Sequence, residues 1–349
     1  MKFYSIILLV ILTSCGEPLT REDLLPNATG AHGEIILLME DDIWTGKIGE
    51  TVSAQLDQNA EGPYLRPEPM FSVFRKRPAE LNHLSQLNRN ILKVMVDFDS
   101  TYKETAVLEK RNYFAKNQLF VIIKDSDPNR LYQYCQTQFS DIIKMFNDFE
   151  LEQLTREYTE RFNENIKDRA TKNFGISICL PKESELKVDS TDFMWVKRDR
   201  SKQLLSNEGT RASETYWIQQ GIVFWSQPYS DTSQLTIPGV LRTRDTILKY
   251  NIPGKVKNSY MATEYDEYYK PEGKIFEYHG AYAVEIRGLW VHRGDPAAFG
   301  GGPFVQYSIH NEKRGTIVTV CGYIYAPKFD KREYIREIDA MLNTIELVD

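Results

Sequence analysis

Residues 281–325 read AYAVEIRGLWVHRGDPAAFGGGPFVQYSIHNEKRGTIVTVCGYIY and contain the strongest strand patterns of the chain. Three runs, 281–292, 304–310 and 316–325, are rich in β-branched and aromatic residues and are separated by turn-forming residues. Consecutive strands with short connections pair in antiparallel fashion. This stretch therefore predicts an antiparallel sheet in the C-terminal half.

Further strand and helix patterns occupy the rest of the chain. The sequence KPEG at 270–273 is a turn signal that predicts a hairpin between two strand runs. Helical spacing of apolar residues at 238–252 and near the C-terminus predicts two helices. The predicted fold class is α+β, with antiparallel sheets and helices packed on their faces in two α/β sandwich-like units. The other strands are expected at 34–39, 71–74, 91–98, 105–111, 118–124, 174–180, 192–198, 216–226, 260–268 and 274–278.

Two helices in the first half carry specific expectations. Asp41 and Asp42 are suited to cap the N-terminus of a helix that begins there. A second helical pattern spans 127–172, but its apolar phase slips near 148–151. Beyond the slip the pattern is heavily charged, which predicts a solvated helix that covers an edge of the core.

Composition along the chain predicts four segments. They are a signal peptide at 1–14, a tether at 15–33, an N-terminal α+β domain at 34–172 that ends in the long charged helix, and a C-terminal α+β domain at 173–349. The tether is assigned because it is rich in Pro, Gly, Thr and acidic residues, which favour turns over regular structure.

The signal peptide prediction depends on Cys15. Lys2 is the only charge before the apolar run 6–12, and Ser14-Cys15-Gly16 follows. The run is too short to span a bilayer. We therefore expect cleavage before Cys15 and acylation of its thiol, which places the protein in the cell envelope, anchored in the outer membrane and facing the periplasm, with surface exposure left open. The alternatives are a plain secretory signal and a cytosolic protein with an apolar first strand.

Charge and cysteine content narrow the range of partners. The net charge is −6 and no basic cluster is present, so nucleic acid is not expected as a partner and acyl chains must provide the membrane contact. Cys135, Cys179 and Cys321 are expected to be buried free thiols, with a bridge between Cys179 and Cys321 left open. The five histidines have no metal-ligand spacing, and no catalytic motif is present. We predict no cofactor, metal site or catalytic residue.

The segment 288–304 is the richest in residues that bind ligands. Consecutive glycines allow a close approach of backbone to another group, and the neighbouring cation and imidazole suit an anion or a carboxylate. The alternative is a long hairpin loop whose glycines only permit the turn. The candidate binding residues are Trp290, His292, Arg293, Asp295, Gly300, Gly301, Gly302 and Phe304.

Short motifs in a fixed order resemble a known family. They include the Cys15 signal, residues 30–34, Trp44-Thr45-Gly46, Glu68-Pro69-x-Phe71, Arg89-Asn90-Ile91-Leu92, Gly288-Leu289-Trp290, Gly301-Gly302-Pro303-Phe304 and Tyr325-Ala326-Pro327. In this respect the chain resembles the envelope lipoproteins of the Bacteroidota type that are catalogued as a domain of unknown function (family 4837). The resemblance implies an envelope location and no particular activity. The C-terminal half is also similar in layout to the α/β/α sandwich of PsbP/Mog1-type proteins.

Two functions remain in view. The first is a non-enzymatic, lipid-anchored binding or assembly module that contacts an envelope protein or polymer. The second is a hydrolase of envelope glycan or peptide that uses carboxylates brought together by folding. The hydrolase requires a cleft with two facing carboxylates and a raised pKa on one of them.

Replacement of Cys15 tests the predicted anchor. Because stable anchoring takes two or more acyl chains, Cys15→Ala should move the protein from the membrane pellet to the soluble fraction of lysed cells. Fractionation followed by immunoblotting measures this. A variant that stays in the membrane fraction would contradict the acylation of Cys15.

Overall fold

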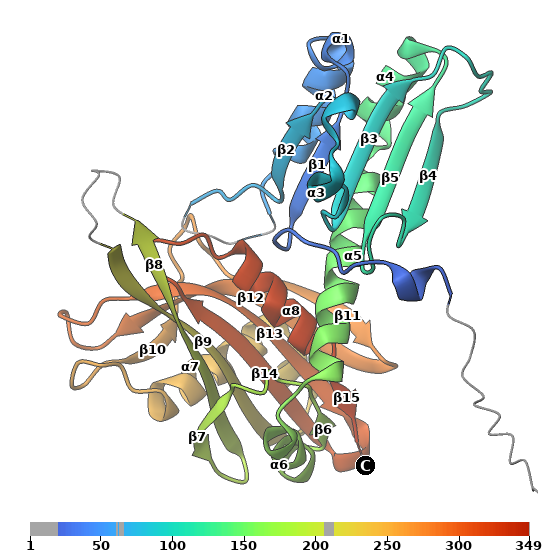
Figure 1. The fold of residues 1–349 in the computed structure, drawn as a ribbon. Coiled ribbons are helices and arrows are strands. Elements are labelled where there is room, and N and C mark those ends of the chain that lie inside the picture. The colour runs from blue at the N-terminus through green and yellow to red at the C-terminus, as the bar shows by residue number, and fades with distance from the viewer. Residues whose placement is uncertain (1–19, 61, 63–65, 206–212, 349) are drawn as a thin grey trace, which may run out of the picture.

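The computed structural model describes residues 20–60, 62, 66–205 and 213–348, so Cys15 and the predicted signal peptide lie outside the described residues. Two units, each built on its own sheet, are joined by the long helix α5 (Phe139–Glu160), which runs from one to the other (Figure 1). Helices pack on both sheets, and the predicted α+β class is confirmed.

The N-terminal unit holds a five-stranded sheet of order β2-β1-β3-β5-β4. Strand β1 pairs in parallel with β2 and β3, and β3 pairs in parallel with β5, while only β4 runs antiparallel to its neighbour. This sheet departs from the expected antiparallel arrangement because helical connections such as α1–α2 return the chain to the same sheet end. The elements are β1 (Glu34–Leu38), α1 (Asp41–Trp44), α2 (Lys47–Leu56), β2 (Ser72–Lys76), α3 (His83–Gln86), β3 (Asn90–Val96), β4 (Ala106–Arg111), β5 (Leu119–Asp125) and α4 (Pro128–Thr137).

The helix expected after Asp41 is in fact two helices. Helix α1 has only four residues, and Gly46, which is extended, is the N-cap residue of α2. Glycine is a poor helix former, so the chain breaks where Thr45-Gly46 interrupts it. Glu40, rather than either aspartate, takes the N-cap position of α1, and Asp41 pairs instead with Arg75 of β2.

The C-terminal unit holds an eight-stranded antiparallel sheet of order β10-β12-β13-β14-β9-β8-β7, with β11 also paired to β12. The three strands predicted within 281–325 form its centre. Its strands are β7 (Glu185–Asp189), β8 (Phe193–Leu205), β9 (Ser213–Pro228), β10 (Tyr260–Thr263), β11 (Glu272–Tyr278), β12 (Ala281–Arg293), β13 (Gly301–Asn311) and β14 (Thr316–Tyr325). A separate two-stranded sheet pairs β6 (Ile176–Ser177) with β15 (Glu346–Leu347).

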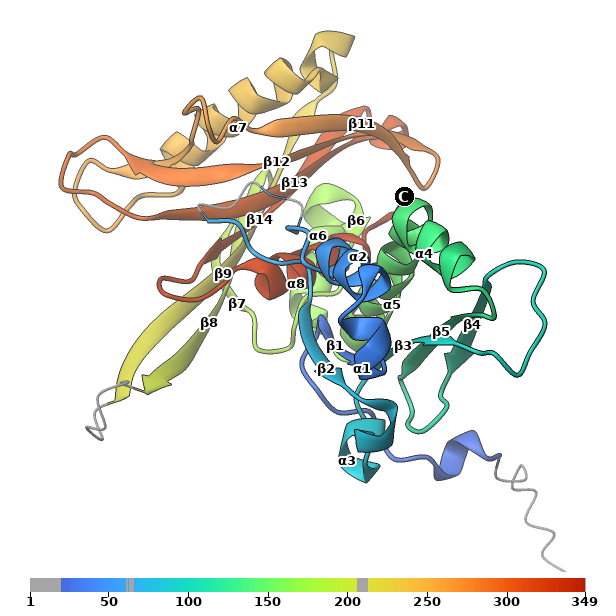
Figure 2. The ribbon, with the colours of Figure 1, turned by 90° about the horizontal axis from the view of Figure 1, so that it is seen from above.

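Helices cover both faces of this sheet. Helix α7 (Ile237–Asn251) lies on one face, and α6 (Glu164–Phe174), α8 (Arg332–Leu342) and the end of α5 lie on the other (Figure 2). Residues 317–324 of β14 are therefore all buried, which explains why this strand reads as a nearly continuous apolar run.

The hairpin predicted around 270–273 is wrong. Strand β10 is only four residues long and pairs with residues 290–293 of β12, whereas β11 pairs with residues 281–287 of the same strand. The two strands therefore follow one another along a single edge of β12. The long partner strand offers hydrogen bonds to both, so residues 264–271 form a loop between two strands that run in the same direction.

The predicted 127–172 helix is divided into α4, α5 and α6, with breaks near Gln138 and at 161–163. Helix α5 is continuous through 148–151, where the sequence pattern slips. Phe146 and Phe149 of α5 pack in the core of the N-terminal unit, while Leu154 and Tyr158 pack in that of the C-terminal unit. The buried stripe changes position because one helix serves two cores.

Glu150 lies where α5 passes between the units, and its side chain is fully buried. Its carboxylate accepts hydrogen bonds from Gly33 N at 3.1 Å and from the Asn90 side chain, and it pairs with His32 Nδ1 at 2.6 Å. Burial acts to raise its pKa, but the bond to His32 and the charges of His32 and Arg89 hold the pKa of Glu150 below its usual value. Hydrogen bonds from this many donors stabilise the buried carboxylate in its charged form.

The predicted tether is described from residue 20 onward. Its last part lies against the N-terminal unit, because Ala28 N donates to Lys116 O at 2.9 Å and Thr29 N donates to Leu87 O at 2.7 Å. Gly33, at the end of the segment, reaches Glu150 of α5. Residues 28–33 are thus hydrogen-bonded to the sheet unit that follows.

Glu68 forms a second connection between the units. This residue is 4% exposed, and its carboxylate accepts from Lys331 N at 2.9 and 2.8 Å and from Arg332 N at 2.7 Å. These amides lie at the N-terminus of α8, where helical N–H groups lack partners within the helix. A side chain from the first unit therefore caps a helix of the second.

The three cysteines within the described residues are buried free thiols, as predicted. Burial raises the pKa of Cys135 to about 12 and also raises the pKa of Cys179 and of Cys321. Thiols of this kind are inert packing groups.

Removal of the Glu68 side chain tests how much this contact between the two units contributes to stability. Glu68→Ala leaves the part-buried amides of Lys331 and Arg332 at the start of α8 without this acceptor and should lower the free energy of unfolding by about 1–2 kcal/mol. Urea unfolding followed by circular dichroism measures the change. Glu157→Ala, which removes an exposed carboxylate of α5, is the control; equal stability of both variants would show that the cap contributes nothing.

Candidate functional site

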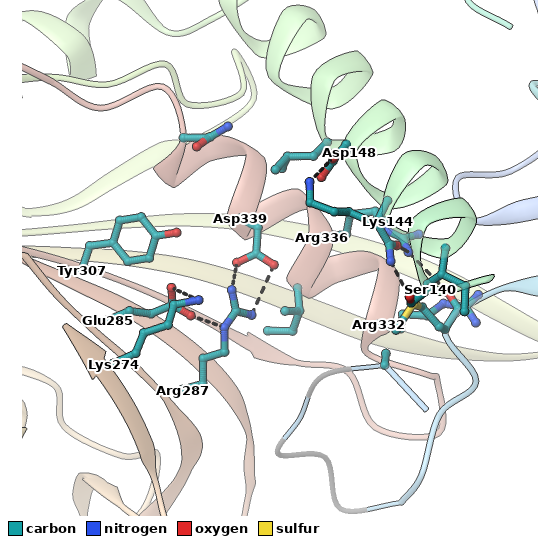
Figure 3. Close-up of a pocket in the computed structure, with 17 residues that line it drawn as sticks. Ser140, Lys144, Asp148, Lys274, Glu285, Arg287, Tyr307, Arg332, Arg336 and Asp339 are labelled. Carbon is teal, nitrogen blue, oxygen red and sulfur yellow. Dashed lines mark hydrogen bonds and ion pairs between the residues drawn. The ribbon is translucent and has the colours of Figure 1, made fainter. Parts of the chain in front are cut away.

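Two concave regions lie on opposite faces of the eight-stranded sheet. We call the first the charged cleft; it has a volume of about 440 Å³ and lies between α5, α8 and strands β11–β13 (Figure 3). We call the second the aromatic pocket; it has a volume of about 490 Å³ and lies beyond the end of α7. Only the second contains residues that the sequence indicated.

An ion network occupies the sheet side of the charged cleft. Arg287 donates to both oxygens of Asp339, at 2.7 and 3.3 Å, and to Oε1 of Glu285, while Lys274 lies 3.0 Å from the other Glu285 oxygen (Figure 3). Burial raises the pKa of Asp339. Each of the four carboxylate oxygens thus already faces a cation, so neither carboxylate is free to bind a reacting group.

The opposite end of the charged cleft is occupied by contacts that hold the units together. Arg336 of α8 donates to Met70 O at 3.3 Å and to Asn147 Oδ1 at 3.2 Å. Arg332 donates to Ser72 Oγ at 3.1 Å and to a neighbouring carbonyl. The cations that line the cleft therefore have partners within the joint.

Four aromatic side chains surround the aromatic pocket. Trp217 of β9 is 66% exposed and Phe299, in the β12–β13 turn, is 89% exposed. Trp290 forms the inner wall, where its Nε1 donates to Ile324 O at 3.0 Å and its ring lies 6.3 Å from that of Tyr325. Large apolar rings held open to solvent on a rigid sheet are typical of ligand or partner sites.

Polar groups lie among these rings. Gln219 Nε2 donates to Asp199 Oδ1 at 3.2 Å across the β8–β9 pair, and Lys255 and His292 line the same pocket. Burial lowers the pKa of His292, and its buried Nδ1 has no hydrogen-bond partner within the described residues. The pocket therefore combines apolar ring faces with hydrogen-bond donors and acceptors.

Only some of the candidate residues in 288–304 line the aromatic pocket. Strand β12 extends to Arg293 and β13 begins at Gly301, so the loop itself is only 294–300, and Trp290 and His292 belong to the strand that lines the pocket. Gly301 and Gly302 line a smaller neighbouring pocket of about 190 Å³. A Cβ on either glycine would lie within 2.5 Å of a backbone oxygen, so this close packing requires them.

The remaining candidates have other surroundings. Arg293 pairs with Glu264 at 2.9 Å, and Asp295 accepts from Ala297 N within the turn. Gly300 has a φ of +133° and packs against His292. Phe304 is 1% exposed and lies beneath the buried guanidinium of Arg244, at 3.7 Å from ring centre to Cζ. The guanidinium of Arg293, which the sequence suggested as part of an anion site, is therefore already paired with the carboxylate of Glu264.

Of the residues that line the aromatic pocket, sequence reasoning named only Trp290 and His292 as candidate binding residues. Trp217, Gln219, Asp199 and Lys255 come from strands and a loop that lie far from 288–304 in the chain. Trp217 and Gln219 alternate along β9 with the buried residues Ile218 and Gln220, so they point to the same face. Alternation alone identifies the face but not the partner strands.

Within the described ranges, no group of three or more His, Cys, Asp or Glu residues is placed to hold a metal ion. Among the helices in those ranges, none has the length and apolar character needed to cross a bilayer.

The fold and pocket define a two-unit α+β protein with a surface site on an antiparallel sheet, and comparison with known families is consistent with this division. Residues 163–344 match the family described as Domain of unknown function (DUF4837), and residues 28–159 match Domain of unknown function (DUF8532). Because the first match covers more than half of the chain, the protein belongs to the DUF4837 family. The match is confined to the C-terminal unit, although the motifs of the expected resemblance extended over both.

Comparisons with individual proteins add little. The Ran-binding protein Mog1p of Saccharomyces cerevisiae is similar at 11% identity and a TM-score of 0.31, over 50% of this chain and 91% of that one. The cyanobacterial PsbP (CyanoP) of Synechocystis sp. PCC 6803 is similar at 6% identity and a TM-score of 0.23, over 47% and 92%. At these scores neither likeness bears on function. No curated protein matches the chain.

The half-buried His292 predicts a pH dependence of stability. Because the folded pKa of His292 is lowered, the unfolded chain binds a proton near pH 6.5 before the folded one does, and stability falls as the pH drops through that value. Urea unfolding at pH 7.5 and 5.5 should show a larger loss for the wild type than for His292→Gln. An equal loss in both would contradict a half-buried neutral imidazole.

Proposed function

We propose that this protein is a lipid-anchored, non-enzymatic binding module of the cell envelope and that the aromatic pocket is its binding site. The observation that carries the proposal is the pair of exposed rings, Trp217 and Phe299, which line the pocket together with the buried ring of Trp290. Leaving two such large apolar side chains in water forgoes about 1.5–3 kcal/mol of burial for each. Contact with a partner recovers that free energy.

The placement of the pocket supports the same proposal. The short helical turn near the start of the described chain (Glu22–Leu24, drawn in dark blue) and the turn between β12 and β13 lie on opposite sides of the molecule in both views (Figures 1 and 2). A chain held through Cys15 would therefore present the pocket away from the point of attachment. Such a position favours capture of material beyond the anchoring membrane over contact with that membrane.

A hydrolase is the second candidate, because the charged cleft holds the two carboxylates that it requires, Glu285 and Asp339, with a raised pKa on the latter. Arg287 and Lys274 occupy all four of their oxygens. A general acid must present its proton to the substrate and a nucleophile must present a free oxygen. The geometry therefore favours the binding module.

Recovery of material from the envelope tests the binding module. The acylated full chain should retain an envelope protein or polymer, identified by mass spectrometry and sugar analysis, and a Trp217→Ala, Phe299→Ala double variant should lose most of it because stacking contacts dominate such sites. Tyr268→Ala, which removes an 87% exposed ring outside the aromatic pocket, is the matched control. Equal recovery by all three proteins would refute the proposal.

A further inference from the structure

We propose that the aromatic pocket recognises a neutral carbohydrate, with a pyranose ring stacked on Trp217 and Phe299 and its hydroxyls bound by Asp199, Gln219 and Lys255. This inference rests on the proposed function and names the class of ligand. Four properties of the pocket lead to this proposal: the exposed ring faces, the polar side chains, the balance of charge and the pairing of the strands that form the floor.

The ring faces suit the apolar side of a sugar. Aromatic faces carry negative charge density, and they attract the slightly positive C–H groups that one side of a pyranose presents. Trp217 and Phe299 are exposed, while Trp290 is 3% exposed and fixed by its bond to Ile324 O. The pocket therefore offers exposed rings at the rim and a buried, hydrogen-bonded ring at the wall.

The polar groups suit hydroxyls. A hydroxyl both donates and accepts, so it requires acceptors and donors side by side. Asp199 Oδ2 and Gln219 Oε1 are not used in the bond that joins these two side chains, and they provide acceptors. Lys255 provides donors from the opposite wall. A purely apolar ligand would leave these groups without partners.

Charge and backbone exclude other ligand classes. One carboxylate and one ammonium balance each other, and His292 is half-buried with the Trp290 ring packed against it at 5.3 Å, so the pocket has no excess of either charge. Gln219 is paired on both sides, with β8 and β14, and Trp290 is paired with β10 and β13. At these two positions the strands have no free edge to which an extended peptide could add, whereas Trp217 lies on a part of β9 that is paired with β8 alone.

Titration of the full chain, purified in a detergent without a sugar headgroup, tests this assignment. The probes are the tetramer of β-1,4-linked N-acetylglucosamine, maltotetraose, an anionic oligogalacturonate and a proline-rich peptide. Calorimetry and tryptophan fluorescence should show saturable binding of at least one neutral oligosaccharide. Trp217→Ala and Phe299→Ala should each weaken it about tenfold, equal to about 1.4 kcal/mol, while Tyr268→Ala leaves it unchanged.

The outcomes separate this inference from the proposed function. No saturable binding of either neutral sugar, tighter binding of the oligogalacturonate or the peptide, or affinity that does not depend on Trp217 and Phe299 would overturn the carbohydrate assignment. If envelope material is still lost with the double variant, the binding module stands with another ligand class. If neither sugars nor envelope material depend on these rings, both proposals fall. Circular dichroism of each variant confirms that it is folded.

Discussion

Helix α5 supplies buried side chains to two hydrophobic cores, and this sharing is the constraint on which the rest of the structure depends. Phe146 and Phe149 pack against the first sheet, and Leu154 and Tyr158 pack against the second unit. A helix has a fixed rise and pitch, so the two cores are held at a fixed separation and rotation. Between these two pairs of residues, Glu150 of α5 accepts a hydrogen bond from Gly33 N and so fixes the chain segment that precedes the first sheet.

The joint formed in this way explains the charged cleft. Glu68 caps α8, and Arg332 and Arg336 bind groups of the first unit, so α8 lies between the two units. The Glu285–Arg287–Asp339 network faces the same space. Desolvation makes such ions costly unless each is paired, and here the pairing is complete. The cleft is therefore best understood as a polar joint that fixes the relative position of the two units.

The other face is free because α7 covers only part of it. The helix ends at Asn251, and beyond that point Trp217, Trp290 and Tyr325 have no helix above them. Neighbouring strands in a sheet run about 5 Å apart, so side chains from β9, β12 and β14 and from one turn meet there without further adjustment. A rigid sheet positions the rings, and exposed Phe299 adds a wall from the turn. This arrangement brings apolar rings and polar side chains together on one surface.

The sequence by itself determined the α+β class, the central strands of the second sheet, helices α7 and α8, and the burial of the cysteines. These follow from local periodicity and from turn residues, which act over a few positions. It also directed attention to Trp290 and His292 through the density of functional residues near the glycines. Only the tertiary structure decided the parallel pairing of the first sheet, the single edge shared by β10 and β11, and the meeting of Trp217 with Phe299. Such pairings join residues distant in the chain, and local patterns do not specify which strands become neighbours. The slip in apolar spacing at 148–151 is an example. The sequence indicated that the buried face changes there, but only the fold showed that one continuous helix packs first in one core and then in the other.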